Sequence, residues 1–377
     1  MSRFEDSLIA AIRSRPSGVD NWCARLEWAA YRIRIGDFKS AKDIMISARE
    51  RGIVYINAKL YSRLNFVEGL YAFFSAGTQS AIDKLLRARA IALGCRGDDY
   101  IHPLINTWLA SIYRNIGDWT GIDRSLNSLL ESQNSISDEV RFRLCLVLAD
   151  ILEEVELYDE AAIWYSLAHD FALILGDDAA ISAMLFNRAS ISIFNLRLQY
   201  ARDQALSLDD GRVALEVASA VNYTHYINDR TMKWSLDLMR AQLHMLKNEA
   251  HAALMLLEAD ELSDTLQQWP DVDVLRQADI FRCRALALAE CRADLMLGMQ
   301  NVLERVKTIE SPGDKALALH SLIIGLRFIN QDPEESLMKM LSDEMRLAND
   351  DRARESEMIS NFLSRHRAKI NFIVRRP

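Results

Sequence analysis

A turn recurs about every forty residues along the first half of the chain, and this spacing constrains the fold more than any single motif. The turn positions Gly36, Gly77, Gly117 and Glu156 follow one another at intervals of 41, 40 and 39 residues, and each lies between two apolar segments of helical period. Such a period is typical of stacked helical hairpins, because one hairpin cannot bury its own apolar face. The sequence therefore predicts an all-α protein.

Weaker turns of the same kind fall near Leu198, Asn248, Arg292 and Gln331. They extend the prediction to an α-solenoid of about eight antiparallel helical hairpins. The interval before Asn248 is longer, so we expect three regions: regular repeats over 1–206, an irregular junction over 207–228, and degenerate helical repeats over 229–377. A final amphipathic helix over about 352–369 is expected to cap the stack, because an end repeat must cover its exposed core. The basic residues 365–369 and 375–376 are expected to form a solvated tail.

The residues around the turns carry a family resemblance. The clearest segments are 108–113 (Trp-Leu-Ala-Ser-Ile-Tyr) with 117–119 (Gly-Asp-Trp), 36–41 (Gly-Asp-Phe-Lys-Ser-Ala) and 158–162 (Tyr-Asp-Glu-Ala-Ala). They resemble tetratricopeptide (TPR) repeats over roughly residues 20–206, and more weakly over 229–350. The usual TPR period is about 34 residues. The longer period here is similar to that of the sensor domains of maltose-regulator-type transcription activators.

The resemblance implies a right-handed superhelix with a concave groove. HEAT repeats also have periods near forty residues and are the alternative architecture, although the Gly-Asp-aromatic turns favour the TPR interpretation. Composition agrees with helix throughout, since the chain has only 14 Gly and 6 Pro in 377 residues.

The net charge and the cysteine content limit the classes of partner and the cellular compartment that we expect. The net charge of −8 argues against general nucleic-acid binding, which normally needs a basic face. The five cysteines are widely spaced and form no Cys-x-x-Cys, which suits a reducing compartment. No stretch predicts a signal peptide or a membrane span. We therefore expect a cytoplasmic protein that does not bind membranes.

Motifs for chemistry are absent from the sequence. There is no phosphate-binding loop, no Gly-x-Ser-x-Gly and no His-Glu-x-x-His. The sequence therefore predicts no catalytic residue, no metal site and no cofactor, and the chain is expected not to be an enzyme.

The resemblance implies a partner-binding groove at fixed positions before each turn. Carried onto this chain, these positions are Arg34, Tyr71, Thr107, Ser111, Arg114, Asn115, Asp150, Glu153, Glu154, Arg188, Ser192 and Asn195. The first hypothesis is a scaffold or adaptor that binds a protein or peptide there. The alternative is a regulatory sensor that binds a small molecule or signal peptide in a closed pocket and relays it to a partner. A homo-oligomer is compatible with both, since the ends and faces of a solenoid expose apolar surface.

Overall fold

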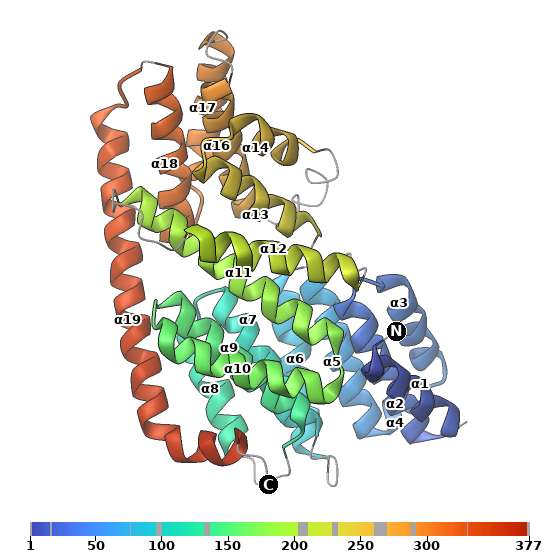
Figure 1. Cartoon of the computed structure of the whole chain (residues 1–377). Coiled ribbons are helices and arrows are strands. Elements are labelled where there is room, and N and C mark those ends of the chain that lie inside the picture. Colours follow the sequence, from blue (N-terminus) through green and yellow to red (C-terminus); the bar gives the residue numbers. More distant parts are fainter. Residues whose placement is uncertain are drawn as a thin grey trace. The chain divides into compact units, whose positions relative to one another are not determined.

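The described part of the chain is entirely helical, with no strand (Figure 1). A computed structural model describes residues 2–15, 17–75, 77–95, 100–131, 136–202, 210–227, 233–259, 270–287, 292–329 and 331–374. Its helices are α1 (Arg3–Ser14), α2 (Val19–Arg34), α3 (Phe38–Glu50), α4 (Ile53–Ile56), α5 (Ala58–Ser75), α6 (Thr78–Leu93), α7 (Ile101–Asn115), α8 (Trp119–Leu130), α9 (Asp138–Glu154), α10 (Tyr158–Leu175), α11 (Asp178–Ala201), α12 (Asp210–Tyr226), α13 (Lys233–Leu246), α14 (Ala250–Leu257), α16 (Pro270–Ala287), α17 (Arg292–Val306), α18 (Pro312–Phe328) and α19 (Glu335–Val374). The predicted all-α class is confirmed.

Neighbouring helices pack in pairs. The pairs α2–α3, α5–α6, α7–α8, α9–α10 and α13–α14 are each joined by a short turn and are in contact along their lengths (Figure 1). The first helices of successive pairs also touch, α2 against α5, α5 against α7, and α7 against α9. The hairpin is therefore the structural unit of this region.

Each predicted turn residue from Gly36 to Glu156 has a positive φ. Gly36, Gly117 and Glu156 each end a helix in the left-handed backbone conformation, whereas Gly77, with ψ 159°, is the N-cap of α6. The angle φ is 81° at Gly36, 112° at Gly77, 66° at Gly117 and 63° at Glu156. The amide after Gly117 donates to the carbonyl of Tyr113, five residues back, which closes a Schellman motif. Glycine takes this conformation without a Cβ clash, which explains three of the four turn residues. Asn248, predicted as a weaker turn, has φ 59° and the same motif.

The acid after the turn glycine caps the next helix. Asp37 accepts a hydrogen bond from the Ser40 amide (3.0 Å), and Asp118 accepts one from the Gly121 amide (2.9 Å). A carboxylate at this position satisfies an amide that has no partner within the helix. The Gly-Asp pair thus ends one helix and begins the next, and this makes the hairpin tight.

Residues at matching repeat positions pack the two helices together. The residues seven positions before the turn, Leu70 and Ala110, are buried, as are Ala41 and Ala161 five positions after it. Gly121 lies directly under Tyr113, where a Cβ would come within 2.4 Å of the ring. Small residues therefore let the helices of a hairpin approach closely.

Several expectations for the second half are corrected. The turn expected at Leu198 is wrong, because this residue lies inside the continuous helix α11. Within the expected irregular junction 207–228, residues 210–226 form the regular helix α12. The capping helix extends well beyond 352–369, since α19 covers Glu335–Val374. Residues 365–369 therefore belong to a helix rather than a tail, while 375–377 and the turn before Arg292 lie outside the described residues.

The chain divides into two compact units. Unit 1 comprises Met1–Met184, Thr224–Thr231 and Glu357–Pro377, and unit 2 comprises Leu185–Tyr223 and Met232–Ser356. This division differs from the predicted boundaries, because the last segment belongs with the first hairpins. In unit 1, Arg141 donates to the carbonyl of Ile373 (2.8 Å), and Arg365 pairs with Asp123 (3.2 Å).

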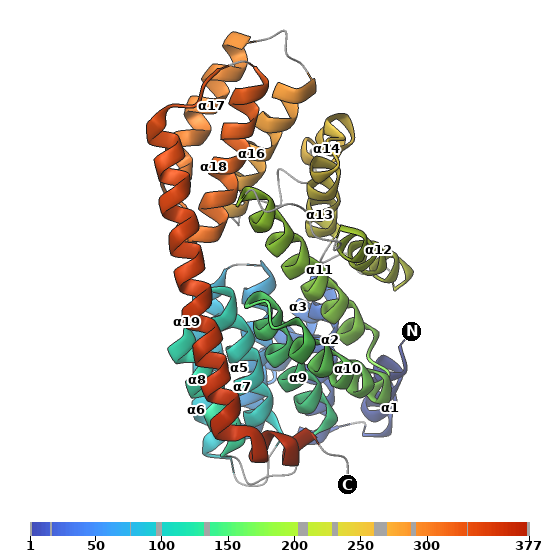
Figure 2. The same cartoon turned by 60° about the vertical axis from the view of Figure 1, so that its left-hand side comes forward.

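Unit 2 has its own apolar core. Helices α16 and α18 lie side by side (Figure 2) and bury Phe281, Leu319 and Leu322 between them. A second cluster joins the unit 2 parts of α11 and α12 to α13 through Ile193, Val217 and others. Ser311 caps α18 by accepting from the Asp314 amide, and α19 begins at Glu335, two residues after Pro333.

One helix in the described ranges, α11, is long and apolar enough to cross a membrane by length and composition. Most of its apolar stretch is buried in the protein, as is usual for the core helix of a folded domain. The helix is therefore only weak evidence for a membrane span.

Candidate binding cavity in unit 1

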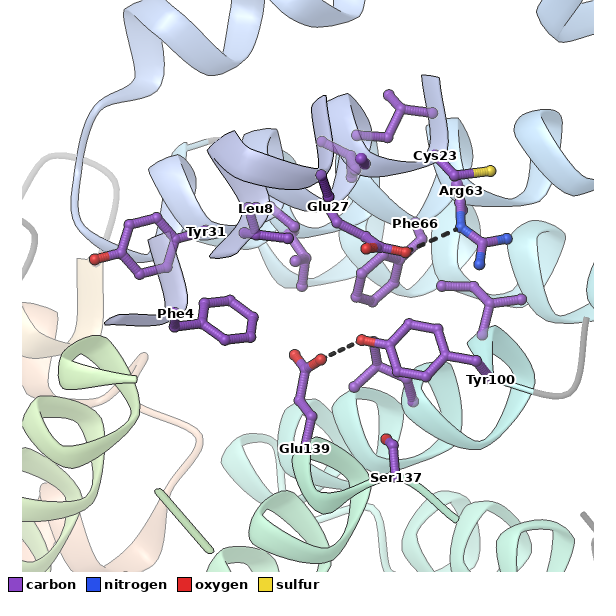
Figure 3. Close-up of a pocket in the computed structure, with 18 of the residues that line it drawn as sticks. Phe4, Leu8, Cys23, Glu27, Tyr31, Arg63, Phe66, Tyr100, Ser137 and Glu139 are labelled. Carbon is purple, nitrogen blue, oxygen red and sulfur yellow. Dashed lines mark hydrogen bonds and ion pairs between the residues drawn. The ribbon is translucent and has the colours of Figure 1, made fainter. Parts of the chain in front are cut away.

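Unit 1 contains a cavity of about 460 Å³ between the first helices of its hairpins (Figure 3). Its walls come from α1, α2, α5, α7 and the beginning of α9, with Tyr100 and Ser137 from the residues before α7 and α9. This volume lies within the range of small-molecule sites in proteins. The lining residues are up to 171 positions apart in sequence, from Phe4 to Leu175, so only the folded unit creates the cavity.

One part of the cavity wall is apolar. Phe66, Leu70, Leu104 and Trp108 line it from α5 and α7, and each is largely buried. Leu8 of α1 contributes to the same lining. A ligand body placed here would lose contact with water over an apolar and aromatic surface, which favours binding.

The remaining wall carries charged groups that are mostly paired with each other. Arg63 reaches Glu27 at 3.5 Å, and the Tyr100 hydroxyl donates to the carboxylate of Glu139, as Figure 3 shows. Burial, followed by the charge of Glu139, raises the pKa of the Tyr100 hydroxyl well above its ordinary value, so this tyrosine stays protonated. These pairs fix the polar side chains at the cavity wall.

Arg34 connects the cavity to the end of the hairpin stack. Its guanidinium lies 2.7 Å from the carboxylate of Asp177, and both side chains are buried. Asp177 also caps α11 by accepting from the Ala180 amide (3.1 Å). Arg34 is thus held in place from two elements and presents a cationic group to the cavity.

A second buried arginine, Arg143, has no such partner. Its residue surface is only 6% exposed, and its Nε donates to nothing. Among the described residues, no carboxylate lies within ion-pair distance and no acceptor takes its N–H groups. Its Cζ lies 3.4 Å from the centroid of the Trp108 ring, a cation–π contact. Burial, followed by the charge of Arg34, lowers the pKa of Arg143 to about 9, so it remains a cation at neutral pH.

Helix α1 closes one side of the cavity. The Ser2 and Tyr31 hydroxyls are 2.9 Å apart, and the Phe4 amide donates to the carbonyl of Gly176 (3.2 Å). Glu5 accepts from the indole of Trp28 and from Arg32. These contacts hold α1 against α2 and the end of α10, so Phe4 and Leu8 complete the lining.

Of the predicted groove residues, Arg34 alone lines this cavity. Thr107, Asp150 and Glu153 are buried, and Thr107 donates to the carbonyl of Leu104 in its own helix. Arg114 is paired with Asp150 and Glu154, and Asp150 also accepts from the Tyr165 hydroxyl (2.9 Å). Three predicted groove residues of unit 1 remain. Tyr71 packs edge-on against Phe38, and Ser111 donates a hydrogen bond to the carbonyl of Thr107. Asn115 is exposed and accepts a hydrogen bond from Arg114.

The other three predicted groove residues belong to unit 2. Arg188 is partly exposed and pairs with Glu216 at 3.0 Å. Ser192 and Asn195 are buried, and Asn195 accepts from Arg352 (3.2 Å). The partner-binding role of the predicted set stays a prediction, but these polar side chains mostly bond within the protein and do not form one exposed surface.

The cavity lies at a different level of the helices from the predicted groove. Glu27, Arg63 and Trp108 precede their turn residues by nine to fourteen positions, whereas most predicted positions lie within six. The spacing of Lys59 and Arg63 at i and i+4 on α5 was the available sequence signal, since it places two cations on one helix face. The contribution of α1, which lies outside the repeats, had no such signal.

Metal ligands do not gather in the described ranges, where no group of three or more His, Cys, Asp or Glu side chains could hold an ion. Cys145 and Cys283 are buried free thiols, and Cys23 lines the cavity. Comparison of the sequence with protein-family models gives no match, and comparison with curated proteins gives no significant similarity. The site must therefore be interpreted from its own geometry.

Proposed function

We propose that the chain is a non-enzymatic ligand-binding regulator, in which the cavity of unit 1 receives a small molecule or a short peptide end and a partner protein reads its occupancy. The observation that carries this proposal is a cavity of about 460 Å³ lined by the first helices of four successive hairpins and by α1. It combines an apolar wall with a few fixed polar groups, which is the composition of small-molecule sites.

In this proposal the hairpins form a TPR-like solenoid, and the cavity occupies its concave side. This is supported by the turn geometry that Gly36, Gly117 and Glu156 share and by the successive contacts of α2, α5, α7 and α9. The protein acts in the cytoplasm, without general nucleic-acid or membrane binding, and self-association is compatible with this role. It needs no metal or cofactor.

A second candidate is an adaptor that binds a partner protein through an extended peptide. It is favoured by the cavity lining near Asp20 and Lys59, where the Asp20 side chain is 67% exposed and the two side chains form an ion pair at 3.4 Å. A peptide end could enter from solvent beside this pair. The two candidates share the cavity and differ in the ligand.

The test is a thermal-shift screen of small metabolites and short peptides with a variant that fills the cavity. Ala30 lines the cavity and is partly exposed, so Ala30→Trp should occupy its volume while the chain still folds. Lys39→Trp, on the exposed surface of α3, is the matched control. We expect compounds that raise the unfolding temperature of the wild type and of Lys39→Trp but not of Ala30→Trp. The proposal fails if no compound does so, or if all three proteins respond alike.

A further inference from the structure

The charges around the cavity of unit 1 are not equally satisfied. Lys59 pairs with Asp20, Arg63 with Glu27, and Arg34 with Asp177. Arg143 stands apart, because within the described residues it has neither an ion pair nor a hydrogen-bond acceptor. Its Nε is buried without an acceptor, and a buried donor that has lost water without gaining an acceptor is costly.

Arg143 is next to the cavity rather than in a separate part of the core. On α9 it lies one turn after Glu139, which lines the cavity, so the two residues share a helix face. Its guanidinium covers the ring of Trp108, another lining residue. The charges of Arg34 and Glu139, both at the cavity wall, are among those that act on it most strongly.

The carboxylate nearest along α9 does not neutralise Arg143. Glu139 accepts from the Tyr100 hydroxyl and makes no ion pair with Arg143. Asp177 is engaged by Arg34 and by the amide of Ala180. Arg143, which borders the cavity beside the lining residues Glu139 and Trp108, thus lacks an acceptor, and an arginine fork fits a planar anion.

We propose that the cavity binds a ligand with an anionic head, a carboxylate or a phosphate, on an apolar or aromatic body, and that Arg143 receives the head. This inference rests on the proposed ligand-binding function and adds the class of ligand. The head replaces the missing acceptor of Arg143, and Arg34 in the cavity lining is a second cation. The body lies against Phe66, Leu70 and Leu104.

Isothermal titration of the full chain with four probes tests this assignment. The probes share a phenylbutyl body and carry a carboxylate, a phosphate ester, an alcohol or an amine, so only the head differs. We expect at least one anionic probe to bind about tenfold or more tightly than the alcohol, because a charge-assisted hydrogen bond contributes an affinity gain of this size. The amine should bind no more tightly than the alcohol. The two anionic probes together show which head the site prefers.

Two substitutions at Arg143 test whether this residue causes the preference for an anionic probe. Arg143→Met keeps the length and apolar stem and should remove the preference for the anion, whereas Arg143→Lys should keep part of it. Arg365→Met, a surface arginine of the same unit, should leave it unchanged. The assignment is overturned if the alcohol or the amine binds the wild type as tightly as both anionic probes, a result that does not depend on whether Arg143→Met folds. It is also overturned if Arg143→Met still prefers the anionic probes.

The outcomes also separate this inference from the function on which it rests. Binding of the alcohol with equal affinity, lost in Ala30→Trp, would leave the cavity as a ligand site and reject only the anionic class. Failure of all four probes to bind the wild type would reject the anionic class as well, while the metabolite screen would still decide the function.

Discussion

At the scale of single residues, unit 1 contrasts arginines that are paired with one that is not. Arg34 and Arg114 are buried beside carboxylates, which offset the loss of hydration. Arg143 has only the Trp108 ring, and a cation–π contact contributes about 2 kcal/mol when desolvated. Its buried Nε therefore has no acceptor in the absence of a ligand.

We expect Arg143→Met to leave the unliganded protein as stable as the wild type or more stable. The substitution removes an unpaired buried cation and keeps a side chain of similar length against Trp108. Urea unfolding without ligand is the measurement. A loss of more than about 2 kcal/mol, the size of the cation–π contact, would mean that Arg143 is held by its surroundings rather than kept for a ligand.

Asp37 gives a pH-dependent prediction. Burial raises the pKa of its carboxyl, but the hydrogen bonds from Ser40 and the Arg32 guanidinium outweigh it and bring the pKa from 3.8 to about 2. A carboxyl whose pKa is depressed on folding stabilises the protein above the unfolded pKa, and this contribution is lost as the pH falls from about 4 to about 2.

Asp37→Asn keeps the capping oxygen and removes the charge. Since the Asp37 and Arg32 side chains are each 25% exposed, water screens the pair, and we expect a loss of roughly 1 kcal/mol at pH 6 that shrinks below pH 4. Urea unfolding of both proteins between pH 2 and 6 measures this. Asp118→Asn, at a cap without an arginine bond, is the control; an Asp37→Asn effect independent of pH would contradict the account.

At the scale of helices, the hairpins depend on turn residues more than on helix propensity. Gly117 needs the left-handed backbone conformation, and a Cβ there would meet nothing within 4 Å. Gly117→Ala should therefore cost about 1 kcal/mol through backbone strain alone. Chemical denaturation measures this cost. Gly94, with φ −83°, is the matched control, and a Gly94→Ala loss as large as that of Gly117→Ala would contradict this interpretation.

The turns also show what the sequence could predict. Gly36, Gly77 and Gly117 were recognisable because few residues tolerate a positive φ. Asn248 fits the same rule, and the turn at Glu156 was predicted from its interval and from the residues 158–162 that follow it. Leu198 was predicted from spacing without a turn residue, and it lies within α11. Spacing without turn chemistry therefore did not locate a helix end.

The candidate site was less accessible to sequence reasoning. Arg34 was predicted from the repeat offsets and lines the cavity, whereas Arg143, Glu139 and Phe4 were not selected. Arg143 is notable only because its neighbours lack a free carboxylate, and this depends on packing between α7 and α9. Phe4 reaches the cavity through the contacts of α1, which no repeat pattern describes.

At the scale of the whole molecule, the end of the chain belongs to the unit formed by its beginning. Phe362 is 2% exposed and lies in the segment Glu357–Pro377 of unit 1, whereas Phe372 in the same helix is 83% exposed. Phe362→Ala should destabilise unit 1 by about 3 kcal/mol, the usual cost of emptying an aromatic site. Phe372→Ala should change stability by less than about 0.5 kcal/mol.

Hydrogen exchange resolves which unit responds. In Phe362→Ala, amides of α7, α8 and α9 should exchange faster, while those of α16 and α18 should keep their wild-type rates. Faster exchange confined to α16 and α18 would contradict the assignment of the last segment to unit 1.

The most direct test of the central claim is native mass spectrometry of the full chain purified from its natural source. The account predicts one small anionic molecule bound per chain of wild type and of Lys39→Trp, and none bound to Ala30→Trp. If none of the three proteins carries a bound molecule, or if Ala30→Trp carries the same molecule as the wild type, the cavity of unit 1 is not a ligand site.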